Sequence, residues 1–240
     1  MAKNVQRKER FDSELRKAVV KVGYGRGFII HDRAEMPPFQ GRPMFRDRRL
    51  VVTAAHCLPK LPPCHAANFP HEKTYESLLG TLDAPEPAVW AECLFADPIA
   101  DIALLGSPDP EAMDKYGEPY DEPIDEYYEL ADEAPALRIG TAPQQGRAWL
   151  LALDGQWVPL AVELSGNGLW IEGNPKNEPG VSGSPLLAED GSAVALVCMG
   201  TSSGRSTADR KPERSGPHPV LAHHLPGWLA KGLEASPKTA

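Results

Sequence analysis

The sequence contains no long apolar run. Residues 1–17 (MAKNVQRKERFDSELRK) lack the apolar core that a secretory signal requires, and no later segment approaches the roughly 18 consecutive apolar residues of a membrane span. We therefore expect a chain that stays in the cytoplasm and does not bind a membrane.

Positive charge is also scarce. The 240 residues carry 25 Lys and Arg against 33 Asp and Glu, for a formal net charge of −8, and the only basic run is a short Arg-Lys cluster near the N-terminus. This balance argues against nucleic acid as a main ligand and predicts a protein or peptide partner. With 42% apolar residues, a chain of this length can bury the core of one large domain or of two small ones that share an interface.

Three short motifs carry the chemistry. They are VVTAAHC at 51–57, DIALL at 101–105 and PGVSGSP at 179–185. A serine hydroxyl is a weak nucleophile until an imidazole takes its proton, and the imidazole needs a carboxylate to fix its tautomer. His56, Asp101 and Ser182 supply these three groups, whereas the nearby Asp97 precedes a proline and no apolar run, which makes it the weaker candidate.

The order of the three groups narrows the choice of family. Subtilisin-type enzymes run Asp, His, Ser, and α/β-hydrolases run Ser, acid, His around a G-x-S-x-G turn, whose fifth position here is Ser184. The His, Asp, Ser order and the three motifs resemble the chymotrypsin-like (trypsin-fold) serine peptidases over roughly residues 18–205.

The resemblance implies a fold and an oxyanion hole. The expected fold is all-β, with two antiparallel six-stranded β-barrels, a short N-terminal helix and a C-terminal helix. His56 and Asp101 would lie on the first barrel and Ser182 on the second, with the active site in the cleft between them. The backbone N–H groups of Gly180 and Ser182 would form the oxyanion hole, and a glycine at 180 suits a turn that a Cβ would obstruct.

Composition and strand patterns divide the chain into five segments. These are a leader of near-helical apolar spacing (1–17), the first barrel (18–108), an acidic interbarrel insertion (109–134), the second barrel (135–205), and a polar segment with a C-terminal helix (206–240).

Two of the connecting segments carry strong composition signals. After a strand expected at 27–30, a polar stretch to about Arg49 contains three prolines and predicts a long loop. The insertion 109–134 has eleven acids and one lysine, which predicts a solvated loop without a continuous core element. The alternative is an acidic flap or docking surface for a basic regulatory partner protein.

Secreted members of the family pair the cysteine after the catalytic histidine with one on the preceding strand. That strand has no cysteine here, so we expect Cys57 to be a free buried thiol, and Cys93 and Cys198 to be small core residues. The alternative is a metal site, because Cys57, Cys64, His65 and His71 offer enough N and S donors, although their spacing matches no standard zinc pattern. We expect no cofactor and no metal.

The residues around the motifs bear on specificity and control. Trypsin-type zymogens have an aspartate directly before the serine, whereas Val181 here cannot pair with a new N-terminal amine. Lys176, six residues before the serine, would lie at the base of the S1 pocket and favour an acidic P1 side chain; the alternative is that it points to solvent. Met199, Gly200 and Thr201 would form the strand that pairs with the substrate backbone.

The sequence thus predicts a serine endopeptidase that works through an acyl-enzyme intermediate and cleaves an intracellular protein target at few sites. The alternative is a catalytically latent protein of the same fold, which would hold a partner with the cleft and the acidic insertion.

Overall fold

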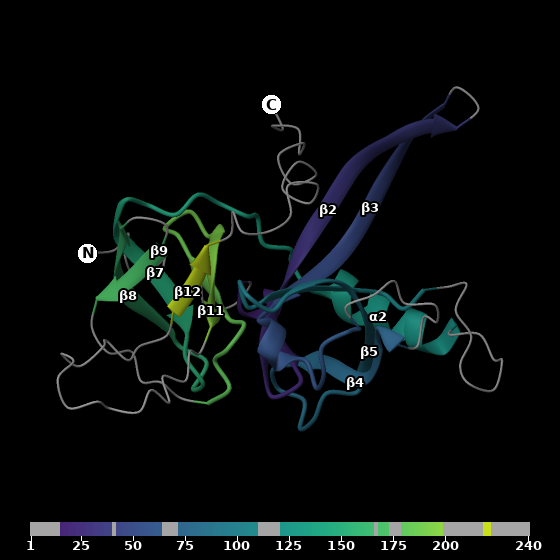
Figure 1. Ribbon diagram of the computed structural model, residues 1–240, viewed down its shortest axis with the longest axis horizontal. Coiled ribbons are helices and arrows are strands. Elements are labelled where there is room, and N and C mark those ends of the chain that lie inside the picture. Colours follow the sequence, from purple (N-terminus) through teal and green to yellow (C-terminus); the bar gives the residue numbers. More distant parts are fainter. Residues whose placement is uncertain are drawn as a thin grey trace.

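The computed structural model describes residues 15–39, 42–63, 72–109, 121–165, 168–172, 179–198 and 218–221. These residues are mostly β, in two bodies that lie side by side, with a single α-helix among them (Figure 1). No helix in these ranges is long and apolar enough to cross a membrane.

The first body is a closed antiparallel barrel, as predicted. Its strands follow one another around the barrel in the order β1-β2-β3-β6-β5-β4. They are β1 (Val19–Val22), β2 (Gly25–Phe39), β3 (Arg42–Thr53), β4 (Thr74–Thr81), β5 (Val89–Asp97) and β6 (Ile102–Gly106). The 3₁₀ turn η1 (Leu15–Ala18) precedes β1, and a second 3₁₀ turn, η2 (Ala55–Cys57), follows β3.

The second body is a six-stranded antiparallel sheet that is only half closed, which corrects the prediction of a second complete barrel. Its order is β12-β11-β10-β7-β8-β9. The strands are β7 (Gln145–Leu151), β8 (Trp157–Ser165), β9 (Gly168–Glu172), β10 (Pro185–Leu187), β11 (Ala193–Cys198) and β12 (His218–Leu221). The edge strands β9 and β12 approach each other, but both are short and no ladder joins them within the described residues.

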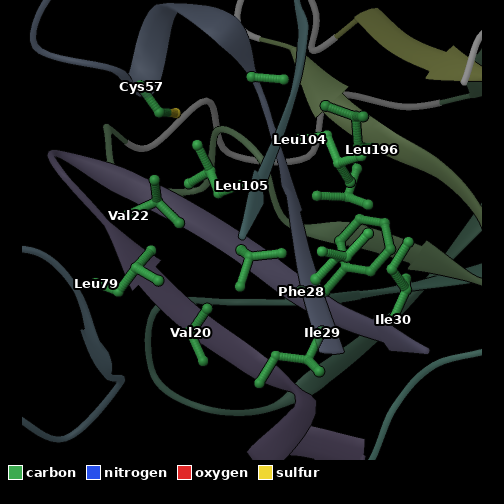
Figure 2. Packing of buried hydrophobic residues seen from close by; sticks show 14 of the residues in the cluster. Val20, Val22, Phe28, Ile29, Ile30, Cys57, Leu79, Leu104, Leu105 and Leu196 are labelled. Atoms are coloured by element: carbon green, nitrogen blue, oxygen red, sulfur yellow. The ribbon is translucent and has the colours of Figure 1, made fainter. Parts of the chain in front are cut away.

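One of two hydrophobic clusters among the described residues joins the two bodies. Strand β1 and the start of β2 bury apolar side chains in this cluster. It includes Phe28 and Ile30 of β2 together with Leu196 of β11 (Figure 2). The segment after the helix binds both bodies: Leu137 N donates to Ile29 O at 2.8 Å, and Gly140 N donates to Ala193 O at 2.8 Å. The shared core and this link hold the second sheet against the first barrel.

The stretch predicted as a proline-rich loop is a long antiparallel ribbon. Strands β2 and β3 pair from Gly27 with Thr53 out to Phe39 with Arg42, and the ribbon projects from the barrel (Figure 1). Its register shifts between Met36 and Phe39, where two prolines lack the N–H that a regular ladder requires. Charged side chains pair across the strands, and Arg48 Nη2 lies 2.9 Å from the buried Asp32 Oδ2. The polar composition therefore reflects cross-strand pairing and not a loop.

Part of the acidic insertion is a packed helix, contrary to the predicted absence of a core element. Helix α2 (Asp121–Glu133) lies against β5 and β3. Its apolar side chains recur every three or four residues, and Tyr127 is fully buried with its hydroxyl donating to Arg49 O at 2.9 Å. Its seven acidic residues dominate the composition and conceal this stripe. Residues 110–120 lie outside the described ranges.

The predicted terminal helices fall mostly outside the described residues. Of the leader 1–17, only the start of η1 is described, and of the segment 206–240 only β12, which pairs with β11 and so extends the second sheet to Leu221.

The cysteines behave as predicted where they are described. Cys57 and Cys93 are free thiols, and all three described cysteines, Cys198 included, are buried. Burial raises the pKa of the Cys57 and Cys93 thiols from their ordinary value of 9.0 to about 11. Both are therefore protonated and weakly nucleophilic at neutral pH.

The packing of α2 predicts unequal effects at two adjacent tyrosines. Tyr127→Ala should lower the free energy of unfolding by about 3–5 kcal/mol because it opens a cavity in the core. Tyr128 is 43% exposed, so Tyr128→Ala should cost less than about 1 kcal/mol. Urea denaturation of both variants measures the difference, and equal losses would contradict a helix that is part of the core.

The raised thiol pKa values predict a pH-dependent loss of stability. Between pH 9 and 11 the folded chain keeps thiol protons that the unfolded chain releases, so the contribution of these thiols to the free energy of unfolding is complete below pH 9 and is lost as pH rises towards 11.

The burial of Cys57 also predicts slow thiol chemistry. In a Cys64→Ser background, the native protein should react slowly with a disulfide reagent at pH 8 and completely in denaturant. Fast native reaction at pH 8 that Cys57→Ala abolishes would contradict the burial of Cys57.

Candidate active site

His56 is presented to solvent by the turn that ends β3. Thr53 Oγ1 donates to Arg26 O at 2.7 Å and anchors the end of the strand, and Cys57 N donates to Ala54 O at 3.0 Å to close η2. The flanking Ala55 and Cys57 point into the core, while the His56 side chain is 42% exposed. The apolar neighbours thus turn the imidazole outward.

Asp101 meets His56 through both carboxylate oxygens. Oδ2 lies 2.7 Å from His56 Nδ1, and Oδ1 accepts the His56 backbone N–H at 3.0 Å. Two hydrogen bonds to one residue fix both the ring and the backbone that carries it. With Nδ1 bound to the carboxylate, Nε2 is left as the proton acceptor.

The turn before β6 determines where this carboxylate lies. Asp97 Oδ1 accepts the N–H groups of Ile99 and Ala100 at 2.9 and 3.0 Å, so Asp97 closes the turn and is not the partner of His56. Asp101 itself has φ +55°, a strained value for a non-glycine residue. Cys198 Sγ lies 3.3 Å from Asp101 O and supports this backbone from the second sheet.

Ser182 lies on a tight turn that is docked on the first barrel. Arg26 N donates to Ser182 O at 2.7 Å, and Gly183 N donates to Val197 O at 2.7 Å. Gly183 has φ +79°, and a Cβ there would lie 1.9 Å from Arg26 O. Only glycine fits at this contact, because both the conformation and the space exclude a side chain.

The N–H groups of Gly180 and Ser182 are available as donors: within the described ranges, neither has an acceptor. Gly180 has φ +99°, which a residue with a Cβ rarely adopts.

The turn that carries His56 contacts the turn that carries Ser182, which comes from the other body. Cys57, the residue after His56, has its Sγ 3.7 Å from Ser182 O. No hydrogen bond joins the Ser182 side chain to His56 in the part of the chain that the structure describes. In enzymes without bound substrate, such bonds are often long and shorten only when substrate binds.

Several predicted residues lie outside the described ranges: Lys176, Met199, Gly200, Thr201, Cys64, His65 and His71. Val181, directly before Ser182, is 4% exposed and packs in the core of the second sheet. Among the described side chains, no three His, Cys, Asp or Glu gather as metal ligands do.

Sequence reasoning missed Arg26. It contacts Ser182 through its backbone and the second sheet through its side chain, which donates to Leu151 O at 2.6 Å. The available signal was a charged residue between Gly25 and Gly27, directly before an apolar strand.

No protein-family model matches the chain, and no curated protein matches it. Among solved structures, it is similar to an inactive form of the Rv3671c protease, with 18% identity, a TM-score of 0.46, and coverage of 90% of this chain and 89% of that chain. It is also similar to an inactive Ser-to-Ala mutant of Rv3671c from M. tuberculosis H37Rv (18% identity, TM-score 0.44, 93% and 90% coverage). A third similar structure is the human pathogenic astrovirus serine protease (15% identity, TM-score 0.41, 86% and 90% coverage).

Proposed function

We propose that this chain is a serine endopeptidase with Ser182 as nucleophile, His56 as general base and acid, and Asp101 as the group that orients His56. The observation that carries the proposal is the pair of hydrogen bonds from Asp101 to the ring and backbone of His56, next to a serine on a turn that requires glycine. A solvated surface His–Asp pair would not need a second bond to the backbone.

The reaction follows from these positions. Ser182 Oγ attacks the peptide carbonyl carbon while its proton passes to His56 Nε2. The carbonyl oxygen becomes an oxyanion, which accepts hydrogen bonds from Gly180 N and Ser182 N. The C–N bond then breaks as His56 returns the proton to the leaving amine, and a water activated by His56 hydrolyses the acyl-enzyme.

We propose a protein or peptide as substrate, cleaved at few sites. Met199, Gly200 and Thr201 would pair with its backbone, and Lys176 at the base of the pocket would favour an acidic side chain before the cut bond. Both assignments rest on the positions of these residues in the sequence relative to Ser182.

A second candidate is a latent protein of the same fold that binds a partner in the cleft. It is favoured by one observation, that no hydrogen bond joins Ser182 to His56 among the described residues. The two candidates differ in whether Ser182 reacts.

A fluorophosphonate should add once to the parent protein, because a phosphonyl group reports both an activated serine and an oxyanion hole. Ser182→Ala should abolish the adduct in intact-mass analysis. Ser192→Ala is the matched control, since Ser192 is also buried but hydrogen-bonds Asp190, away from His56, and it should label like the parent. No adduct on the folded parent would reject the enzyme and favour the latent protein.

Asp101→Asn should lower kcat on a reactive peptide ester by a factor on the order of 10⁴, with KM little changed, because the amide favours the wrong histidine tautomer. Asparagine tolerates φ near +55°, so the backbone should be retained. Asp97→Asn serves as control, since an asparagine Oδ1 can still accept the N–H groups that close the turn, and it should change kcat less than tenfold. Equal losses in the two variants would contradict the role of Asp101.

A further inference from the structure

Arg26 contacts both the turn that carries Ser182, here called the nucleophile turn, and the end of β7 in the second sheet. We propose that it is a positioning residue, whose guanidinium holds the 152–156 turn against the turn of Gly180 and Ser182. The proposal rests on the proposed function for its catalytic consequence, and on the contacts of Arg26 for its physical basis.

The backbone of Arg26 forms the seat of the nucleophile turn. Its N–H donates to Ser182 O at 2.7 Å, and its carbonyl accepts Thr53 Oγ1 at 2.7 Å. The same carbonyl limits how closely Gly183 approaches. A displacement of Arg26 would therefore move Ser182 directly.

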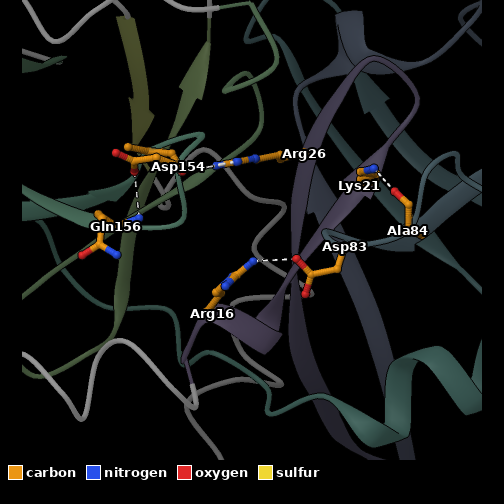
Figure 3. Close-up of polar contacts among 8 residues, drawn as sticks. Arg16, Lys21, Arg26, Asp83, Ala84, Asp154 and Gln156 are labelled. Carbon is orange, nitrogen blue, oxygen red and sulfur yellow. Dashed lines mark hydrogen bonds and ion pairs between the residues drawn. The ribbon is translucent and has the colours of Figure 1, made fainter.

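The side chain of Arg26 reaches the end of β7. Nη1 donates to Leu151 O at 2.6 Å and lies 3.4 Å from Ala152 O, which Nη2 also contacts at 3.4 Å. These carbonyls lie at the start of the 152–156 turn, which Ala152 N closes by donating to Gln156 O at 2.9 Å. Within the turn, Gln156 N donates to Asp154 Oδ1 at 3.0 Å (Figure 3). The guanidinium thus fixes the turn at its first residues.

The 152–156 turn lies against the turn of Gly180 and Ser182. Leu153 Cδ2 is 3.6 Å from the position that a Cβ on Gly180 would occupy. Contacts therefore run from the Arg26 guanidinium through the Leu151 and Ala152 carbonyls to Leu153, and from there to Gly180. Leu153 is 44% exposed, so core packing holds it only in part, whereas the guanidinium binds the carbonyls directly before it.

The chemistry of Arg26 suits this role. The residue is 7% exposed, and its hydrogen bonds among the described residues go to carbonyls and not to carboxylates. Burial, and then the charge of Arg16, lower its pKa. The planar fork of donors can bind two successive carbonyls, which a lysine ammonium on a shorter stem does less well.

The test compares Arg26→Met, Arg26→Lys and the control Arg48→Met. Arg48→Met also removes a polar contact of a guanidinium, here the ion pair with the buried Asp32. Both residues of that pair lie on the projecting ribbon. Well below the melting temperature, Arg26→Met should slow fluorophosphonate labelling by about 10- to 100-fold, since a displacement near 1 Å can cost this much. Arg26→Lys should recover part of the rate, and Arg48→Met should stay within twofold. Labelling of Arg26→Met within threefold of the parent, or equal slowing in Arg48→Met, would overturn the proposal.

Hydrogen–deuterium exchange separates this proposal from the proposed function. Peptides that cover 179–187 should exchange faster in Arg26→Met but not in Arg48→Met. If the parent does not label, the proposed function fails, and the exchange result alone decides: faster exchange in Arg26→Met supports the positioning role, and unchanged exchange overturns it.

A further variant keeps the test valid if Arg26→Met does not fold. Leu153→Ala changes an exposed side chain, and it should slow labelling less than additively when combined with Arg26→Lys, because both act through one turn. Fully additive effects would overturn the proposal.

Discussion

The contact between the Ser182–Gly183 turn and the backbone of Arg26 is the constraint on which the candidate site depends. One hydrogen bond of 2.7 Å and one position without room for a Cβ bring the second sheet to the first barrel at the serine. The shared hydrophobic cluster packs the two bodies together, but hydrophobic burial is non-directional. The polar contacts at Arg26 specify how far the Ser182 turn lies from the first barrel.

The two halves of the site are built differently. His56 and Asp101 belong to one closed barrel and hold each other through two hydrogen bonds. Ser182 comes from a half-closed sheet, and its relation to His56 depends on how that sheet docks. A closed ladder resists deformation, whereas an open edge allows it. The position of Ser182 therefore depends more on how the two bodies pack than the His56–Asp101 pair does.

Much of this site could be predicted from sequence, because the chemistry of each motif needs particular residue types. The His56–Asp101 pair, the glycines of the Ser182 turn and the free thiol of Cys57 were predicted from the three motifs and from the family that they resemble. The β2–β3 ribbon and helix α2 were not predicted. A composition rich in prolines and charges is typical of a loop, but Arg48 of β3 pairs with Asp32 of β2, and Tyr127 of α2 packs in the core.

By itself, the sequence determined the kinds of groups available, their order along the chain and the strand patterns of the first barrel. The tertiary structure alone decided that the second sheet stays half closed and that Arg26 joins Ser182 to the end of β7. The physical reason is range. Residue chemistry and strand alternation are local properties, whereas Arg26 and Leu151 are 125 positions apart, and only packing of the two bodies brings a buried guanidinium to its carbonyls.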